Sequence, residues 1–258
     1  MRKGTGSFSW KNREQDLASV KRYHSRRVMF YRTNLAVHSL RVQGILAMLL
    51  PGVFSTHPDF NPELARLISK FHDDPEMASK RGDVQLGLKY LMSPDEKARL
   101  REEEVEAAEL LSRSYGNPEI GGYRYLDLVM HGMSKDIPEA QLHSFADKLD
   151  GYGEALHEVL AGNLAFLEPV INYMAQTFND LPGHFPLIAD AFKPDNPLFH
   201  FPVVKQAIYF EGGKAGSFLH TPESVEWESG IVHYELWKVV TKSMPGGVDL
   251  LTTQTEFY

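Results

Sequence analysis

The chain has 258 residues, a formal net charge of -7 and a hydrophobic fraction of 43%, which is enough for one large domain with a core of its own. The negative charge argues against binding to nucleic-acid polymers or anionic membranes, because both are polyanions. The chain has no cysteine. Disulfides and thiolate metal sites are therefore excluded, and a metal could bind only through histidine, carboxylate or backbone oxygen.

The N-terminal segment Met1–Gly6 is followed by polar residues and has no apolar stretch of the kind found in signal peptides. No uninterrupted apolar run elsewhere approaches the ~20 residues of a membrane span. We therefore expect a protein without membrane contact that works in the cytoplasm, either of a cell or of an infected host.

Basic residues cluster between residues 13 and 32, with aromatic residues among them. One interpretation is a solvated helix face or an irregular arm. The other is a contact with a phosphate group or a base close to the first histidine of the candidate site. The basic residues are Lys21, Arg22, His24, Arg26, Arg27 and Arg32.

The first clear helix is predicted from Thr33 or Asn34, either of which can cap its start, to about Leu50, before Pro51-Gly52. His38 lies on its apolar stripe. Taken alone, a histidine on an apolar face is more often a core residue than a ligand, so its neighbours must decide its role. The stripe is formed by Leu35, Val42, Ile45, Leu46 and Leu49.

A second helix is predicted to begin at Asn61-Pro62, where a capping side chain precedes a proline at the first helical position. His72 and Asp73 follow at the edge of its apolar face, and Pro75 should end or redirect the helix. Adjacent histidine and aspartate side chains are costly to bury unless they are paired or bound to a metal. This turn is therefore a candidate site.

A third helix should begin with the capping box Ser93-Pro94-Asp95-Glu96 and run to about Ser114. A fourth should start at the capping pair Asp136 and Glu139. Asp147 lies opposite the apolar stripe of this fourth helix, on a side where small residues would let another helix approach closely, although an exposed aspartate fits the periodicity equally well. The small residues are Ser144, Gly151 and Ala155.

A last helix is predicted over roughly residues 223–242, before Pro245-Gly246-Gly247. We expect its aromatic residues Trp227, Tyr234 and Trp237 to be exposed and to suit the contact of a homodimer. The elements together predict an all-α fold. Its core would comprise residues 1–168, and residues 169–258 would form a C-terminal helical extension packed on that core.

Four side chains from these helices could form one site: His38, His72, Asp73 and Asp147. Two imidazoles and two carboxylates suit one divalent ion such as manganese, cobalt, iron or zinc, with positions left for water and substrate. A histidine, then a His-Asp pair, then a late aspartate resembles the ordered signature of the HD superfamily of metal-dependent phosphohydrolases.

The bacterial 5′-deoxynucleotidase branch of this superfamily is the closest resemblance, over about residues 20–168. The resemblance implies an HD-domain helical bundle, a single divalent ion, with magnesium also possible, and hydrolysis of nucleoside 5′-monophosphates, preferably deoxy ones. It also favours Asp147 over Asp150 or His143 as the last ligand. The similar segments are Arg32-Thr33-Asn34 with Val37-His38-Ser39, His72-Asp73 with Glu76, Gly82-Asp83, Lys89-Tyr90, Ala146-Asp147 with Leu149 and Tyr152, and Leu160-Ala161-Gly162-Asn163.

We expect Glu76 to accept a proton from the attacking water or to orient that water. Asp83 would contact the deoxyribose hydroxyl or act as a second acid or base. The family pattern has an arginine and a tryptophan before the first histidine, where this chain reads Tyr23-His24-Ser25-Arg26-Arg27-Val28. Phosphate binding is therefore assigned to Arg26, Arg27 and Lys89.

Two alternatives use the same scaffold. Because residues 23–28 differ from the family pattern, hydrolysis of deoxynucleoside triphosphates is one alternative function. A non-catalytic nucleotide sensor could keep the metal site, but it would not need a water-activating base such as Glu76. Each of these functions implies a small-molecule nucleotide as the partner.

Overall fold

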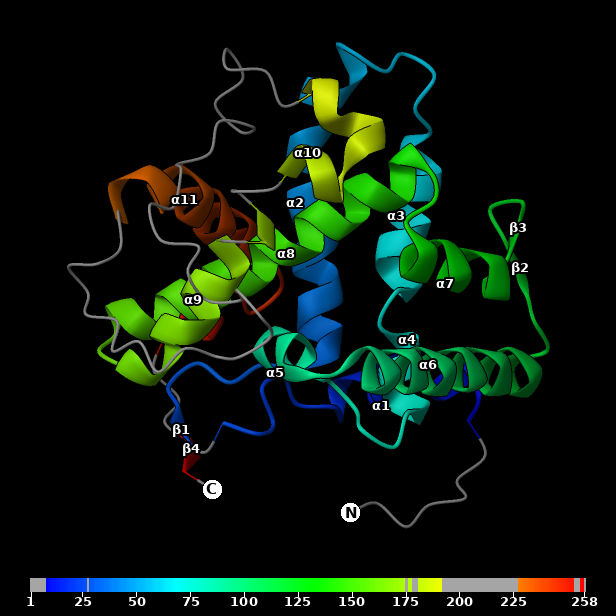
Figure 1. Cartoon of the computed structure of the whole chain (residues 1–258), viewed down its shortest axis with the longest axis horizontal. Helices are drawn as coiled ribbons and strands as arrows, with labels where there is room; N and C mark the ends of the chain where they lie inside the picture. The colour runs from blue at the N-terminus through cyan, green and yellow to red at the C-terminus, as the bar shows by residue number, and fades with distance from the viewer. Residues whose placement is uncertain are drawn as a thin grey trace.

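The computed structural model describes residues 8–26, 28–174, 176–177, 181–191, 227–252 and 256–257. These residues form mainly α-helices, which confirms the predicted all-α class (Figure 1). The α-helices are α1 (Arg13–Ala18), α2 (Leu35–Phe54), α3 (Pro62–Phe71), α4 (Asp74–Ala78), α5 (Leu86–Leu91), α6 (Pro94–Tyr115), α7 (Tyr125–Ser134), α8 (Pro138–Leu160), α9 (Leu167–Met174), α10 (Leu181–His184) and α11 (Trp227–Ser243).

Short 3-10 helices and two-residue strands complete the described structure. Strand β1 pairs antiparallel with β4 near the ends of the described chain, and β2 pairs antiparallel with β3 in a hairpin before α7. The strands are β1 (Val28–Met29), β2 (Glu119–Ile120), β3 (Tyr123–Arg124) and β4 (Glu256–Phe257), and the 3-10 helices are η1 (Trp10–Asn12), η2 (Leu164–Phe166), η4 (Pro186–Ala191) and η7 (Asp249–Leu251).

Helix α2 passes through the middle of the molecule and packs against α3, α8 and α11 (Figure 1). The Asn34 side chain begins it by accepting a hydrogen bond from the amide of Val37, as the capping pattern predicts. The predicted end at Pro51 is wrong, because the helix continues to Phe54. Pro51 deprives the Ala47 carbonyl of its helical donor, and water can replace that donor because Ala47 is exposed.

Among the described residues, α2 is also the one helix that is long and apolar enough to cross a membrane. The central helix of a helical core passes the same test. Helix α2 carries the buried polar residues His38 and Arg41 and packs against α1, α3, α8 and α11. We therefore interpret it as a core helix.

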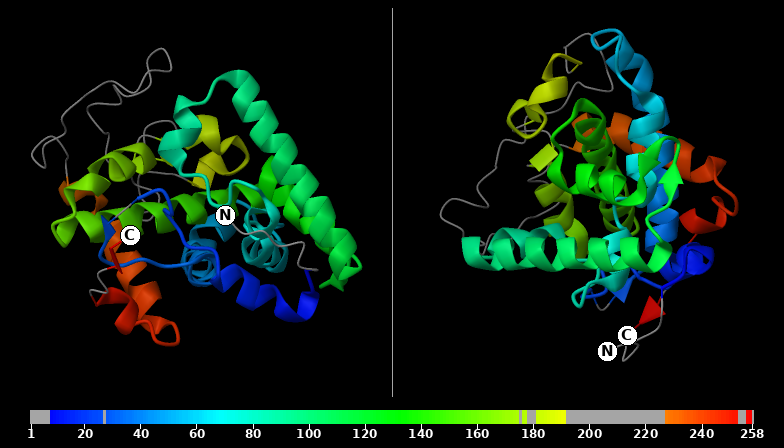
Figure 2. Two further views of the ribbon diagram at one scale, coloured as in Figure 1. Left: turned by 90° about the horizontal axis from the view of Figure 1, so that it is seen from below. Right: turned by 90° about the vertical axis from the view of Figure 1, so that its right-hand side faces the viewer.

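Two buried apolar clusters meet along α3 and α8. One cluster surrounds α2, α8, α9 and α11, and the other fills the space between α3, α6 and α7. Helix α6, which begins with the predicted capping box at Ser93 and Glu96, runs along one edge of the molecule in the left view of Figure 2. Because α3 contributes to both clusters and ends at Phe71, the His72-Asp73 pair that follows it lies where the two clusters meet.

The turn after α3 is built differently from the sequence prediction. Asn61 caps α3 as predicted, and α3 ends at Phe71. Pro75 does not terminate this helix. It occupies the first turn of α4, where a backbone N–H would have no acceptor within the helix, so proline is tolerated there. The chain direction thus changes at His72 and Asp73, which leaves both side chains in the junction between α3 and α4.

The start of α8 also differs from the prediction. Ile137 precedes the helix and no side chain caps it. Asp136 instead accepts a hydrogen bond from Ser134 and contacts His131, while Glu139 accepts one from the backbone amide of Asn61. Tertiary contacts therefore use the two residues that the local pattern assigned to capping.

The predicted close approach to the small-residue side of α8 is confirmed. A β-carbon added at Gly151 would lie 2.3 Å from the Tyr173 ring of α9. On the other side of α8, which the prediction did not cover, a β-carbon added at Gly153 would lie 2.2 Å from the Trp237 ring of α11. Glycine at these positions lets α9 and α11 pack directly on α8.

The predicted exposure of the aromatic residues on α11 is wrong for the two described side chains. Tyr234 is 6% exposed and Trp237 is 1% exposed, because both pack inside the larger apolar cluster. The Trp227 side chain lies outside the described residues. The homodimer therefore stays a prediction, without support from Tyr234 and Trp237.

Asp74, to which the sequence assigned no role, holds α1 and α7 against the turn. Its carboxylate is fully buried and forms two 2.6 Å contacts with the Arg13 guanidinium. The Tyr125 hydroxyl donates a third hydrogen bond of 2.9 Å. This network links α1 and α7 to the first residue of α4, directly after Asp73.

We expect Arg13→Met to lower the free energy of unfolding by about 3–5 kcal/mol, because it leaves a buried carboxylate without its cation. Urea unfolding of the metal-free protein would measure this loss. Arg66→Met is the matched control, since the Arg66–Glu63 pair is about half exposed and should contribute at most about 1 kcal/mol. Equal losses in both variants would contradict the structural role of the Arg13–Asp74 pair.

Candidate metal centre and its pocket

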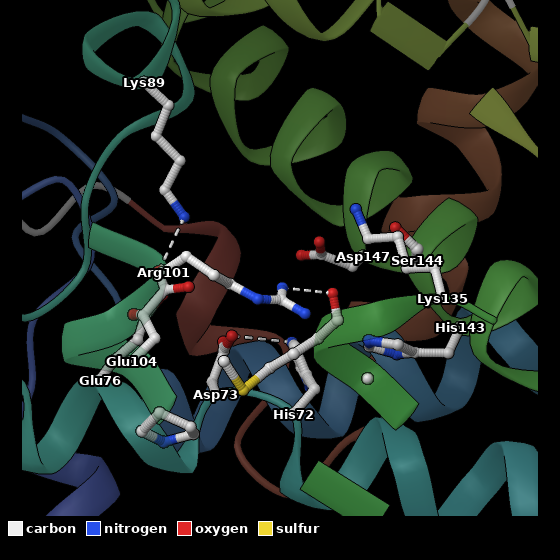
Figure 3. A pocket seen from close by; sticks show the side chains of 13 residues that line it. His72, Asp73, Glu76, Lys89, Arg101, Glu104, Lys135, His143, Ser144 and Asp147 are labelled. Carbon is white, nitrogen blue, oxygen red and sulfur yellow. Dashed lines mark hydrogen bonds and ion pairs between the residues drawn. The ribbon is translucent and has the colours of Figure 1, made fainter. Parts of the chain in front are cut away.

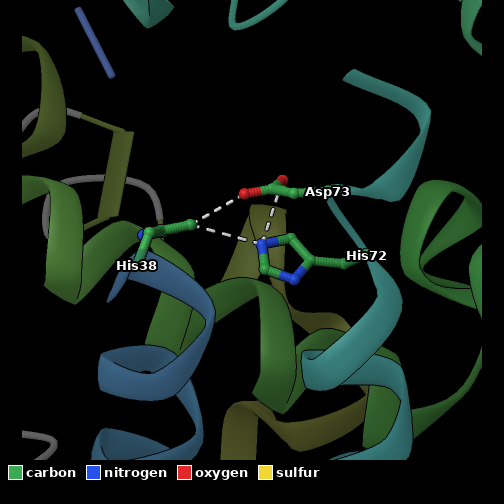
Figure 4. Close-up of side chains that lie close together, drawn as sticks. All are labelled: His38, His72 and Asp73. Atoms are coloured by element: carbon green, nitrogen blue, oxygen red, sulfur yellow. Dashed lines mark hydrogen bonds and ion pairs between the residues drawn. The ribbon is translucent and has the colours of Figure 1, made fainter. Parts of the chain in front are cut away.

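Side chains from α2 and from the end of α3 converge on one point (Figure 4). His38 Nε2 lies 3.1 Å from Asp73 Oδ2 and 3.3 Å from His72 Nε2. His72 Nε2 lies 3.0 Å from Asp73 Oδ1. One potential ligand atom of each residue lies within 4.8 Å of the other two, so these three side chains could hold one metal ion.

The second nitrogen of each imidazole has its own acceptor. His38 Nδ1 lies 2.6 Å from Asp150 Oδ2, and His72 Nδ1 lies 2.9 Å from the Ser69 carbonyl oxygen. Both acceptors favour a proton on Nδ1, which leaves the Nε2 lone pairs directed at the common point. Two such lone pairs repel unless a cation lies between them, so the arrangement fits a metal ion.

Asp147 of α8 lies beside this three-residue cluster. Its Oδ1 is 3.2 Å from His38 Nε2. Its Oδ2 is held by the ammonium group of Lys148. Asp147 is not part of the compact group of three, but one of its oxygens faces that group and could complete the ligand set.

The charges around His38 favour a cation at this point. Burial alone would lower the pKa of the His38 imidazolium, and the nearby Arg22 guanidinium lowers it too. Three carboxylates around the ring outweigh both effects and raise the pKa well above its ordinary value. The three carboxylates belong to Asp73, Asp147 and Asp150. Without a metal ion, the imidazolium proton supplies the positive charge that these carboxylates require.

A pocket of about 180 Å³ lies next to the cluster, between α4, α5, α6, the end of α7 and α8 (Figure 3). Its lining includes His72, Asp73 and Asp147 together with several basic side chains. Lys89 lies 3.5 Å from Glu104, and Arg101 donates a 2.6 Å hydrogen bond to the carbonyl of Met133. The basic residues in the lining are Lys89, Arg101 and Lys135.

Glu76 contributes a carboxylate to the same pocket. Its Oε2 is buried and has no hydrogen-bond partner among the described residues. Burial raises the pKa of Glu76 well above its ordinary value, and the neighbouring negative charges of Asp73 and Asp83 raise it further. A carboxylate in this state is suited to accept a proton.

Lys135 is a second unusual group in the pocket. It follows α7 in the left-handed conformation, with φ of 56°, which is uncommon for a residue with a side chain. Burial lowers its pKa to about 7, with a further contribution from the positive charge of Lys148. Strained backbone and a perturbed pKa at one residue are typical of functional sites.

The structure brings together six of the predicted site residues, namely His38, His72, Asp73, Asp147, Glu76 and Lys89. Asp83 does not line the pocket, and its Oδ2 accepts a hydrogen bond from the Tyr23 amide. Its predicted contact with the sugar stays untested. Arg27 lies outside the described residues.

Arg26 also does not line the pocket. Its guanidinium contacts Gln85, the Ala165 carbonyl and Glu168 at distances of 3.0–3.3 Å. The sequence could not exclude Arg26 from the phosphate site, because these partners come from segments far along the chain. Its assignment to phosphate stays a prediction, and the described geometry gives it a structural role.

Sequence reasoning missed two cations and one carboxylate. Neither Arg101 nor Lys135 belongs to a motif in the sequence. Asp150 was considered only as a ligand alternative to Asp147, whereas it contacts the outer nitrogen of His38. Arg41 could have indicated the role of Asp150, because an arginine on the apolar side of α2 needs a carboxylate partner. In the structure, Asp150 Oδ1 lies 2.8 Å from Arg41 Nε.

A protein-family model described as 5′-deoxynucleotidase YfbR-like matches residues 13–181. The matched segment includes every predicted ligand and the whole described pocket lining. It confirms the resemblance drawn from the ordered motifs, and it extends past residue 168. The division into residues 1–168 and 169–258 stays a prediction. Comparison with curated proteins gives no match.

We expect anion binding to weaken as the pH rises through about 7, because Lys135 is charged below its pKa and neutral above it. Sulfate is a suitable probe, since it remains a dianion over this range. Its affinity, measured by calorimetry between about pH 6 and pH 8.5, should fall about tenfold more in the natural protein than in Lys135→Arg, because one charge-assisted hydrogen bond is lost.

Lys135→Arg is the control because its guanidinium stays charged over the whole range. Other groups titrate in both proteins, so the ratio of the two affinities isolates Lys135. A ratio that does not change with pH would contradict the role of Lys135 in anion binding.

Proposed function

Because this chain belongs to the YfbR-like 5′-deoxynucleotidase family, we propose that it hydrolyses deoxynucleoside 5′-monophosphates to nucleoside and phosphate. The family is one of metal-dependent hydrolases. One observation carries the proposal for this chain. The carboxylate of Glu76, whose Oε2 has no hydrogen-bond partner among the described residues, lines the same small pocket as His72 and Asp73 of the His-His-Asp cluster and three basic side chains.

We propose His38, His72, Asp73 and Asp147 as ligands of one divalent ion. Mixed nitrogen and oxygen ligands favour manganese, cobalt, iron or zinc, with magnesium as a further possibility. Such an ion, when bound, lowers the pKa of a water molecule and withdraws negative charge from a phosphate group. The hydrogen bonds at both Nδ1 atoms keep the two imidazoles directed at it.

The remaining pocket residues have complementary roles in this proposal. Glu76 accepts the proton of the attacking water, as its raised pKa and missing hydrogen-bond partner suggest. Arg101 and Lys135 neutralise the phosphate dianion through charge-assisted hydrogen bonds. Lys89 lines the pocket while it pairs with Glu104, and its ammonium group can add to the positive charge that Arg101 and Lys135 offer the phosphate.

We further propose a free nucleotide in the cytoplasm as the substrate, rather than a nucleic-acid polymer or a membrane component. The net charge of -7 and the pocket of about 180 Å³ support this choice. Such a pocket has room for a phosphate group and its water, while a long polyanion would be repelled by the protein as a whole.

Product analysis tests the proposed reaction. The protein would be incubated with mono- and triphosphates of each deoxynucleoside in the presence of manganese or cobalt. We expect deoxynucleoside and inorganic phosphate from the monophosphates. Release of intact triphosphate from deoxynucleoside triphosphates would favour a triphosphate hydrolase. Nucleotide-induced thermal stabilisation without any phosphate release would favour a sensor.

Glu76→Gln should lower kcat by about 10²–10⁴-fold, which is the usual contribution of a general base. Metal binding, followed by calorimetry, should persist because the predicted ligands remain. Glu103→Gln is the matched control, since Glu103 lies on α6 and pairs with Arg81 outside the pocket. Full activity of Glu76→Gln would contradict the role of Glu76 as the base.

A further inference from the structure

Helix α11 lies beyond the segment that the family model matches, yet it packs directly on α2, which carries His38, and on α8, which carries Asp147 and Asp150. A β-carbon added at Gly44 of α2 would lie 2.5 Å from Val240, and Gly153 of α8 leaves the corresponding space for Trp237. The contact buries Trp237 to 1% exposure. Helix α11 is thus seated in a space that glycines on α2 and α8 provide.

The indole of Trp237 reaches His38 through one carboxylate. Trp237 Nε1 donates a 2.7 Å hydrogen bond to Asp150 Oδ1, and Asp150 Oδ2 lies 2.6 Å from His38 Nδ1. All three residues are at most 1% exposed. Both oxygens of the carboxylate are therefore engaged, Oδ2 by His38 of α2 and Oδ1 by Trp237 of α11 together with Arg41 of α2.

We propose that Trp237 is a positioning residue for the metal centre and that, through Asp150, it makes metal binding by His38 depend on helix α11. This inference rests on the proposed function, because it takes His38 as a metal ligand. A carboxylate that accepts the outer proton of a metal-binding imidazole fixes the ring and raises its basicity. Trp237 fixes the rotation of that carboxylate in turn.

Arg41 also contacts Asp150, but it does not make Trp237 redundant. Its Nε lies 2.8 Å from the same Oδ1, and its guanidinium carbon lies 5.0 Å from the centre of the Trp237 ring. Arg41 is shared with Glu154 at 3.3 Å. Loss of the indole N–H therefore leaves Oδ1 with Arg41 as its partner among the described residues, and the guanidinium of Arg41 is divided between Asp150 and Glu154.

Trp237→Phe removes the N–H donor and keeps an aromatic ring against Gly153. Tyr234→Phe is the matched control on the same helix. It removes a hydroxyl that bonds His157 Nδ1 at 2.7 Å, and that hydroxyl has no hydrogen bond to Asp150 or His38. Each variant therefore loses one hydrogen bond between α11 and α8, a buried one in Trp237→Phe and a partly buried one in Tyr234→Phe, but only Trp237→Phe loses the link to the metal centre.

Manganese binding to the full chain would be measured by calorimetry, and the unfolding of the metal-free proteins by urea would be measured beside it. We expect the dissociation constant of manganese to rise about tenfold or more in Trp237→Phe and to change less than about twofold in Tyr234→Phe. In hydrolysis assays, Trp237→Phe should need more manganese for half-maximal rate, while kcat at saturating manganese stays near that of the natural protein.

Equal manganese affinity in the two variants would overturn the inference, whether both are unchanged or both are weakened by a loosened α11. A natural protein that binds manganese and hydrolyses nucleotides, with Trp237→Phe unaltered, would leave the proposed function standing and refute only the role of Trp237. A natural protein that binds no divalent metal would refute both.

Discussion

The hydrogen bond between His38 and Asp150 is the interaction on which the site and the packing around it depend. A carboxylate with 0% exposure is expensive to bury, and it is tolerated because Arg41, Trp237 and His38 surround it. These partners come from α2 and α11, while Asp150 belongs to α8. The carboxylate that directs the imidazole therefore also ties three helices together.

A second carboxylate extends this buried network toward the N-terminal segment. Glu154 lies one turn after Asp150 on α8 and pairs with Arg22 at 2.9 Å and with Arg41 at 3.3 Å. The two arginines and two carboxylates balance in charge, which leaves His38 free to be neutral when a cation is present. Arg22 also packs its guanidinium 5.5 Å from the ring of Tyr23, so this chain does place an arginine and an aromatic residue together before the first histidine.

Two sources of information in the sequence allowed correct predictions: local hydrogen bonding at the helix ends, and the ordered His, His-Asp, Asp motif. The caps at Asn34, Asn61 and Ser93 follow from local hydrogen bonding, and the structure confirms them. The convergence of His38 and His72 was predictable only from the resemblance, because spacing alone allows each to be a core residue. By contrast, the burial of Trp237 depends on Gly153, some eighty residues away, which no periodicity argument connects. The partners of Arg26 and the burial of Lys135 could not be predicted for the same reason, since their environments come from distant segments.

The charge balance of the pocket explains why a lysine with a lowered pKa belongs there. A divalent ion would be neutralised by Asp73 and Asp147, and Lys89 is largely offset by Glu104. Arg101 and Lys135 then remain to meet a phosphate dianion. A permanent second cation beside Arg101 would be costly while the pocket is empty, and a pKa of about 7 lets Lys135 shed that charge. A bound dianion favours the protonated form, so binding itself restores the charge that it needs, at the cost of taking up a proton.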